Sequence, residues 1–348
     1  MNDGRRYPNW TPGIELREDW LASVREDIID PEREIVDPHH HLWRHGDAVY
    51  ELDALHSDTG AGHNVVQTVY VECRSYYRSD GDPAFHPVGE TAHIARLAAS
   101  IPAGKARIAG IIAHADLRRP DLSDLLDAHV KAGQGRLVGI RHSGARDPEP
   151  HRLMIPGRGD DGLYADPDFR RGVALLGERG LTYDTWHYHH QADAFLALAK
   201  AVPGTTLVLD HLGTPLGVGR FAGRRNTVHA VWKEDMTALA RCPNVMAKLG
   251  GLSMPDNGWA WHERHRPPSS DELVAAQGAW FRHMIACFGP ERCMFESNFP
   301  VDRVSVSYAV LWNAFKKIAM DHDADAQAHM FAGTARSVYG LSPLRISG

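Results

Sequence analysis

Short apolar runs rich in β-branched residues alternate along the chain with longer stretches whose apolar residues recur every three or four positions. The short runs have the composition of buried strands, and they span residues 34–41, 65–73, 106–117, 136–142, 180–189, 205–213, 244–252 and 292–300. The longer stretches predict helices, among them 89–101, 121–133, 168–180, 191–202, 235–242 and 279–289. Strand followed by helix, repeated eight times, predicts an α/β fold of the (β/α)8 TIM-barrel type. A doubly wound open sheet is the alternative, but no G-x-G-x-x-G follows the first strand.

The predicted barrel occupies residues 34–348, and residues 1–33 form an N-terminal extension that contains a short amphipathic helix. No low-complexity linker divides the chain, so we expect one barrel domain. Long segments follow strand six (213–232) and strand seven (253–270). Loops of this length in a compact domain are usually functional, and we expect both to roof the site.

Charge and cysteine content narrow the choice of partners and compartment. The formal net charge of -6 is spread without acidic or basic blocks, which argues against nucleic acid or an anionic membrane as a partner and favours a small-molecule substrate. The 4 cysteines are scattered and predicted to be reduced. No apolar run reaches the length of a membrane span, and the polar start has no signal-peptide core. We therefore expect a cytoplasmic protein, and the sequence leaves open whether it forms a homo-oligomer.

Polar and ionisable residues end nearly every predicted strand. In a barrel these ends face one rim, where the active site is built. The repetition over eight strands predicts a functional site from residues His39, His41, Glu72, His114, Asp116, Arg141, His142, Asp184, His187, Asp210, His211, Lys248, Glu296, Asn298 and Asp302.

The first strand ends in three consecutive histidines, in "IVDPHHHLWRH". Successive side chains of a strand point to opposite faces, so His39 and His41 are predicted to share one face with Asp37. His40 is then predicted to point the other way and pack among helices. The pair His39 and His41 is a candidate metal site, although zinc needs three or four ligands in all.

Further candidates would contact the substrate. Arg141 and His142 are expected to bind an anion or a carbonyl, because a guanidinium holds a carboxylate through two parallel hydrogen bonds. Glu72, at the end of strand two, is expected to line the same rim. In the loop after strand seven, Trp259 is predicted to form an aromatic wall together with its neighbours, or else to pack that loop onto the barrel.

Strand five ends in "DTWHYHHQ", which offers several histidines. His187 shares strand parity with Tyr183 and Thr185, whereas Asp184 and Trp186 share the other parity. Only one of these two sets can face the barrel interior. We expect one ligand or substrate contact among His187, His189, His190 and Trp186, with the others structural, and the alternation does not decide between them.

Three motifs in order, "DPHHHLW", "DHLGTP" and "FESNFPVD", resemble the amidohydrolase superfamily, specifically its lactonase-like amidohydrolase-2 branch. This branch includes pyrone-dicarboxylate lactonase and sugar lactonases, and the resemblance runs from about residue 34 to 341. It implies a (β/α)8 barrel with hydrolytic chemistry at its mouth, the rim formed by the C-terminal ends of the strands. His39, His41 and His211 match histidines of the first and sixth strands, and His187 falls on the strand that carries a metal ligand in the wider superfamily.

Asn298 falls where many members of the family carry an Asp that ligates a metal or activates water. An amide cannot act as a base and is a poorer ligand for a divalent cation. We therefore expect Asn298 to orient water or substrate, with His211 as the first candidate for the base, Asp302 as the second and Glu296 as a third. At most one divalent ion is predicted, most plausibly zinc, bound by His39, His41 and His187, and a metal-independent mechanism stays open.

These observations predict a hydrolase that acts on a lactone or a related carbonyl substrate of acidic or aromatic origin, by attack of water at the mouth of the barrel. The alternative is a metal-dependent decarboxylase of an aromatic or muconate-type acid, against which Asn298 argues. A third interpretation, a binding protein on a decayed barrel, conflicts with the many titratable groups at the rim.

Overall fold

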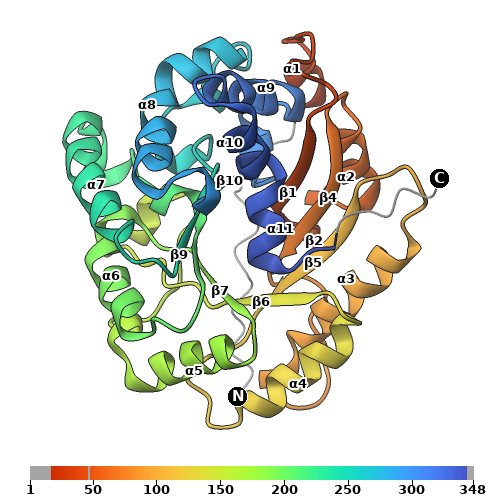
Figure 1. The fold of residues 1–348 in the computed structure, drawn as a ribbon, viewed down its shortest axis with the longest axis vertical. Coiled ribbons are helices and arrows are strands. Elements are labelled where there is room, and N and C mark those ends of the chain that lie inside the picture. Colours follow the sequence, from red (N-terminus) through yellow and green to blue (C-terminus); the bar gives the residue numbers. More distant parts are fainter. Residues whose placement is uncertain (1–16, 46–47, 343–348) are drawn as a thin grey trace.

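The computed structural model describes residues 17–45 and 48–342 of the chain. Eight parallel strands form one sheet in the order in which they occur in the sequence (Figure 1). The strands are β1 (Glu34–His40), β4 (Asn64–Val71), β5 (Arg107–Ala113), β6 (Leu137–Arg141), β7 (Thr182–Thr185), β8 (Leu207–Leu209), β9 (Val245–Leu249) and β10 (Cys293–Phe295). Each strand overlaps one of the predicted runs.

The sheet closes on itself through the backbone that follows β10. The amide of His41 donates to the carbonyl of Phe299 over 2.8 Å, and the amide of Asn298 donates to the carbonyl of His39 over 3.0 Å. These bonds place the segment after β10 beside the end of β1. The predicted (β/α)8 barrel is therefore confirmed, and its last strand delivers its polar residues next to the histidines of its first.

Helices surround the barrel, one after each strand (Figure 1). They are α2 (Leu52–Thr59), α3 (Val88–Ser100), α4 (Leu122–Gly133), α5 (Pro167–Glu178), α6 (Ala192–Ala201), α7 (Arg225–Leu239), α8 (Ser270–Phe288) and α9 (Tyr308–Ala319). The prediction of a loop over residues 213–232 is wrong in part, because α7 begins inside this range at Arg225. The loop over 253–270 contains only two short 3₁₀ turns before α8 begins. A small hairpin, β2 (Trp43–His45) and β3 (Ala48–Tyr50), was not expected.

The end of the barrel at which the strands begin is covered by the last two helices of the chain. After α10 (Ala324–Ala328), a π-helical turn leads into α11 (Thr334–Tyr339). Arg336 forms an ion pair with Glu34 at the start of β1, 2.6 Å apart. Tyr339 packs with the aliphatic residues that fill the barrel, namely Val36, Val69, Val71, Ile112, Val208 and Met294. The C-terminal ends of the eight strands lie at the opposite end of the barrel.

The N-terminal segment is helical for only one turn, α1 (Glu18–Leu21), so the predicted amphipathic helix is shorter than expected, and residues 1–16 lie outside the described residues. The segment docks on the barrel: Glu18 pairs with Arg303 over 2.6 Å, and Trp20 Nε1 donates to the carbonyl of Arg264. Across residues 17–45 and 48–342, no helix combines the length and the apolar character needed to cross a bilayer.

Candidate active site

The end of β1 turns two of its three histidines into the barrel. The register with β4 shifts between Asp37 and His40, which breaks the simple alternation. His39 and His41 contact each other, whereas His40 meets the ring of Tyr70 at 5.8 Å. Asp37 accepts a hydrogen bond from the hydroxyl of Tyr308 on α9 over 2.9 Å. The expectation that Asp37 shares the face of the pair is wrong, because the irregularity separates them.

His39 and His41 are held with their Nε2 atoms 3.3 Å apart. The Nδ1 of His41 donates to the carbonyl of Val71 over 2.8 Å, and the Nδ1 of His39 lies 2.9 Å from Glu296 Oε2. Burial lowers the pKa of His41 to about 3 and, with the positive charge of Lys248, holds that of His39 well below its ordinary value. Both rings are therefore neutral, and their Nε2 atoms face each other; the tautomer of His39 depends on whether its Nδ1 donates to Glu296 or accepts from Lys248.

A second pair joins the loop after β8 to the end of β10. His211 adopts a left-handed backbone conformation (φ 56°), and Glu296 Oε1 accepts from both its amide (3.1 Å) and its Nδ1 (2.7 Å). Burial opposes charge on both groups, but their mutual attraction outweighs it. The pKa of Glu296 falls to about 2, and that of His211 is raised. The pair is thus an ionised carboxylate with an imidazole that readily carries a proton.

Two glycines after β9 make room for this pair. A Cβ on Gly251 would lie 2.4 Å from the His211 ring, and one on Gly250 would lie 2.1 Å from the Glu296 carbonyl. Neither position tolerates a side chain without displacing the pair. Sequence analysis did not single out these residues, although the doubled glycine directly after a strand was the available signal.

Lys248, fully buried on β9, supplies a fixed positive charge beneath the histidines. Its Nζ lies 2.8 Å from Asp184 and 3.0 Å from Asp210, and 3.3 Å from the His39 Nδ1. The hydroxyl of Tyr339 donates to the same Asp184 carboxylate over 2.6 Å. Glu296 contacts His39 and His211 instead.

Asn298 and Asp302 lie beside each other at the mouth. Asn298 Nδ2 donates to Asp302 Oδ1 over 3.1 Å, and the amide of Ser253 donates to Oδ2 over 3.1 Å. Burial raises the pKa of Asp302 to about 7 against these hydrogen bonds. Asn298 Oδ1 is buried without a protein partner. Arg303 turns away to Glu18 and Asp58, so it does not neutralise Asp302.

Arg141 and Glu72 form a buried pair on the other side of the mouth. Arg141 Nε donates to Glu72 Oε1 over 2.9 Å, and its Nη2 donates to the Glu72 carbonyl. Arg141 also lies 3.7 Å from Asp210. His142 lies apart from this pair: its Nδ1 accepts from the amide of Leu117, and its ring meets Phe169 at 5.4 Å. The structure therefore brings Arg141 into the charged cluster and His142 into the packing around it.

Among the described residues, the strand-five and loop candidates form no hydrogen bond or ion pair with the side chains of the charged cluster. The ring of His187 packs against Phe195 of α6 at 4.8 Å, because β7 turns Asp184 into the barrel and leaves the opposite parity for the helices. Trp186 packs in the loops with Tyr188 at 5.9 Å. Trp259 is stacked under the guanidinium of Arg225 at 3.4 Å. The roles predicted for these residues stay predictions.

The donor atoms at the mouth fit a divalent cation. The Nε2 atoms of His39 and His41 are close enough to bind one cation together. Metal-bound histidines commonly donate their other N–H to a carbonyl or carboxylate, as His41 does to Val71. Among the described residues, the ligand atoms of His39, Asp210 and His211 also lie within 4.8 Å of one another. His39 is common to both sets, and His187 belongs to neither.

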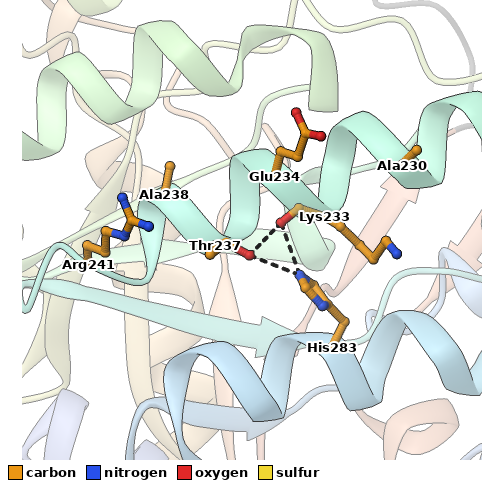
Figure 2. A pocket seen from close by; sticks show the side chains of 7 residues that line it. All are labelled: Ala230, Lys233, Glu234, Thr237, Ala238, Arg241 and His283. Atoms are coloured by element: carbon orange, nitrogen blue, oxygen red, sulfur yellow. Dashed lines mark hydrogen bonds between the residues drawn. The ribbon is translucent and has the colours of Figure 1, made fainter.

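A surface hollow of about 540 Å³ lies between α7 and α8, remote from the mouth (Figure 2). His283 Nε2 lies 3.0 Å from the carbonyl of Lys233 and 3.4 Å from Thr237 Oγ1. Lys233 and Glu234 extend from the exposed face of α7 and carry opposite charges (Figure 2). These contacts join two neighbouring helices and bring no group toward the barrel.

Comparison with known proteins places this geometry in a family. The Amidohydrolase family model matches residues 36–341. The chain is 30% identical to uncharacterized protein y4mH of Sinorhizobium fredii over 322 residues (88% of this chain, 98% of the relative). It is 29% identical to L-fucono-1,5-lactonase of Burkholderia multivorans over 325 residues (88% and 96%).

Solved structures agree with this assignment. A crystal structure of a Burkholderia multivorans amidohydrolase with bound zinc superposes with a TM-score of 0.69 at 26% identity, covering 88% of this chain and 99% of the other. The same comparison with a crystal that contains bound HEPES gives 0.70 at 27% identity, with equal coverage. The chain belongs to the amidohydrolase family, within its lactonase-like branch, and is a hydrolase.

Proposed function

We propose that this chain hydrolyses the ester bond of a lactone at the mouth of its barrel. The observation that carries the proposal is Asp302, a buried carboxyl with a pKa of about 7, bonded to an amide whose oxygen is free to accept a hydrogen bond from water. A general base is most effective when its pKa is close to the working pH. The similarity to L-fucono-1,5-lactonase supports the same reaction class.

In the proposed mechanism, Asn298 Oδ1 orients a water and the Asp302 carboxylate takes one of its protons as the water oxygen bonds to the lactone carbonyl carbon. The ring C–O bond then breaks, and His211 donates a proton to the departing ring oxygen. Glu296 keeps His211 protonated for this step. The product is the open hydroxy acid. The sequence predicted His211 as the first candidate for the base and Asp302 as the second. In this proposal Asp302 is the base, because the contact with Glu296 makes His211 the proton donor.

His39 and His41 would bind a divalent ion, with Asp210 as a further donor within reach of His39; His211, as the proposed acid, carries a proton and is not counted as a ligand. Such an ion supplies Lewis-acid polarisation of the carbonyl when it is bound. Zinc is the proposed identity, since imidazole nitrogens suit it and the Burkholderia multivorans amidohydrolase was crystallised with zinc.

The charges at the mouth favour a neutral, hydroxylated lactone over a dicarboxylate. Both buried cations already have carboxylate partners: Arg141 is paired with Glu72 and Lys248 with Asp184 and Asp210. A substrate carboxylate would have to displace one of these partners or enter beside them. Sugar hydroxyls can instead donate to Glu72 Oε2, which is buried without a partner. The acidic substrate expected from the arginines is therefore not our proposal.

A panel of lactones tests the reaction, with acid release from neutral sugar lactones and from a pyrone dicarboxylate followed beside carbon dioxide release from aromatic acids. We expect hydrolysis of a neutral lactone, preferred by at least about 10-fold in kcat/KM over the acidic one because of like-charge repulsion. Carbon dioxide release without lactone opening would overturn the proposal in favour of the decarboxylase alternative.

A further inference from the structure

A buried carboxyl outside the mouth holds the turn that leads out of β4. Glu90 lies on α3 and is 2% exposed. Its Oε1 atom accepts from the hydroxyl of Tyr70 (2.8 Å), the amide of Cys73 (3.1 Å) and the amide of Ser75 (2.9 Å). Three donors that converge on one oxygen fix the path of the backbone between residues 73 and 75.

The turn held in this way is strained. Arg74 and Tyr76 have φ values of 61° and 58°, in the left-handed region that non-glycine residues rarely adopt. Such conformations persist only where surrounding contacts determine them, and they cluster near functional sites. Glu90 accepts hydrogen bonds from the amides of Cys73 and Ser75, on both sides of Arg74. It therefore stabilises the left-handed conformation of Arg74.

The residue immediately before the turn is Glu72, the partner of Arg141. Arg141 binds both the carboxylate and the backbone carbonyl of Glu72. A shift of the turn therefore moves the acceptor atoms that orient the guanidinium. Glu72 Oε2 has no protein partner, and Arg141 lies near Asp210 and His41. A change in the conformation of the turn therefore changes the position of groups on the substrate-binding side of the mouth.

Charge is divided unequally between the two glutamates. Burial, followed by the negative charge of Glu72, raises the pKa of Glu90 to about 8. Burial also opposes ionisation of Glu72, but Arg141 outweighs it and lowers the pKa of Glu72. The other titratable groups facing Glu90 are Tyr70, Cys73 and Tyr77, whose pKa values burial raises further. At neutral pH Glu72 carries the charge and Glu90 keeps its proton.

We propose that Glu90 is a positioning residue for substrate binding, which holds the 73–75 turn so that Glu72 and Arg141 keep their orientation at the mouth. Without this acceptor, the amides of Cys73 and Ser75 lose their partner and the turn loosens. Substrate affinity then falls while the groups that transfer protons are untouched. This inference rests on the proposed function for its kinetic consequence only.

Two variants at one position separate positioning from general structure. Glu90→Gln keeps an acceptor oxygen and mimics the neutral acid, whereas Glu90→Ala removes the acceptor. Hydrogen–deuterium exchange over residues 72–77, corrected for intrinsic rates, should show lost protection at Cys73 and Ser75 in Glu90→Ala and retained protection in Glu90→Gln.

With a lactone substrate, Glu90→Ala should raise KM by about 10-fold, the loss expected from one misplaced charged hydrogen bond, with kcat within about 3-fold. Glu90→Gln should keep the wild-type KM. Unchanged protection and KM in a folded Glu90→Ala variant would overturn the inference. If that variant does not fold, lost protection at Cys73 and Ser75 in Glu90→Gln with an unchanged KM overturns it. Exchange needs no substrate, so failure of the lactonase proposal is recognised separately, by absent activity in the wild type.

Discussion

Two stretches of the chain each carry three histidines within four residues, at 39–41 and at 187–190. In the first, His39 and His41 point into the barrel and meet through their Nε2 atoms. In the second, His187 packs against the helix layer, and His189 accepts a hydrogen bond from the amide of Leu216. The first stretch forms the candidate site, and the second joins loops around it.

The two stretches differ in what holds the second ring nitrogen. In the first pair, His41 Nδ1 donates to a backbone carbonyl, and His39 Nδ1 lies beside the Glu296 carboxylate and the Lys248 ammonium, so both Nε2 atoms face the mouth. His187 has its Nδ1 3.4 Å from Thr185 Oγ1, and its Nε2 is buried without a partner. Histidine spacing alone therefore does not identify a ligand; the partner of the other nitrogen does.

The largest effect is expected in the first stretch. His39→Ala and His41→Ala should each lower kcat/KM by ~100- to 1000-fold, the range for removal of one contact that stabilises the transition state. His40→Gln is the matched control and should stay within a few-fold of wild type, because His40 faces Tyr70. Steady-state kinetics on a neutral lactone measures all three, and equal losses would contradict the assignment of inward and outward faces.

A smaller effect is expected from Asn298→Asp beside the first stretch. The carboxylate should tighten zinc binding by on the order of 10-fold, because it adds an anionic oxygen ligand near the two histidines. It also replaces the amide that donates to Asp302 with a like charge, so the pKa of Asp302 should rise and activity at pH 7 should fall by about 10-fold. Competition with a chelator and a pH–rate profile measure the two changes. Weaker zinc binding would argue that the ion lies elsewhere.

The smallest effect is expected in the second stretch. His187→Asn should change kcat/KM by no more than about 3-fold, and lower the free energy of unfolding by ~1–2 kcal/mol through lost packing against Phe195. Kinetics beside urea unfolding measure the two. A loss of activity comparable to that of His41→Ala, with stability unchanged, would restore His187 as a ligand and remove the contrast between the two stretches.

The architecture could be read from the sequence because each buried strand is an apolar run of distinctive length. Local irregularities of the backbone could not be predicted in this way. The register shift between Asp37 and His40 separates Asp37 from the pair His39 and His41, and the alternation of side chains along a strand does not predict such a shift. Likewise, the start of α7 at Arg225 depends on packing that a run rich in glycine and arginine does not signal.

Which residues form the candidate site was easier to predict from the sequence than the role of each residue. His39, His41, His211, Asn298 and Asp302 all lie at the mouth, as strand ends in a barrel require. The pairing of His211 with Glu296 depends on a left-handed turn after β8 and on the space at Gly251, which are properties of the folded backbone. That pairing is what changes His211 from an expected base to a proposed acid.

The pH dependence of kcat/KM in Asp302→Asn, compared with wild type, tests the central claim most directly. Asp302 must be ionised to accept a proton, so wild-type kcat/KM should rise as pH increases through about 7, where its pKa lies. In Asp302→Asn this acidic limb should disappear, with a loss of at least ~100-fold at pH 8. A limb with the same apparent pKa that persists in the variant would contradict Asp302 as the base and return that role to His211.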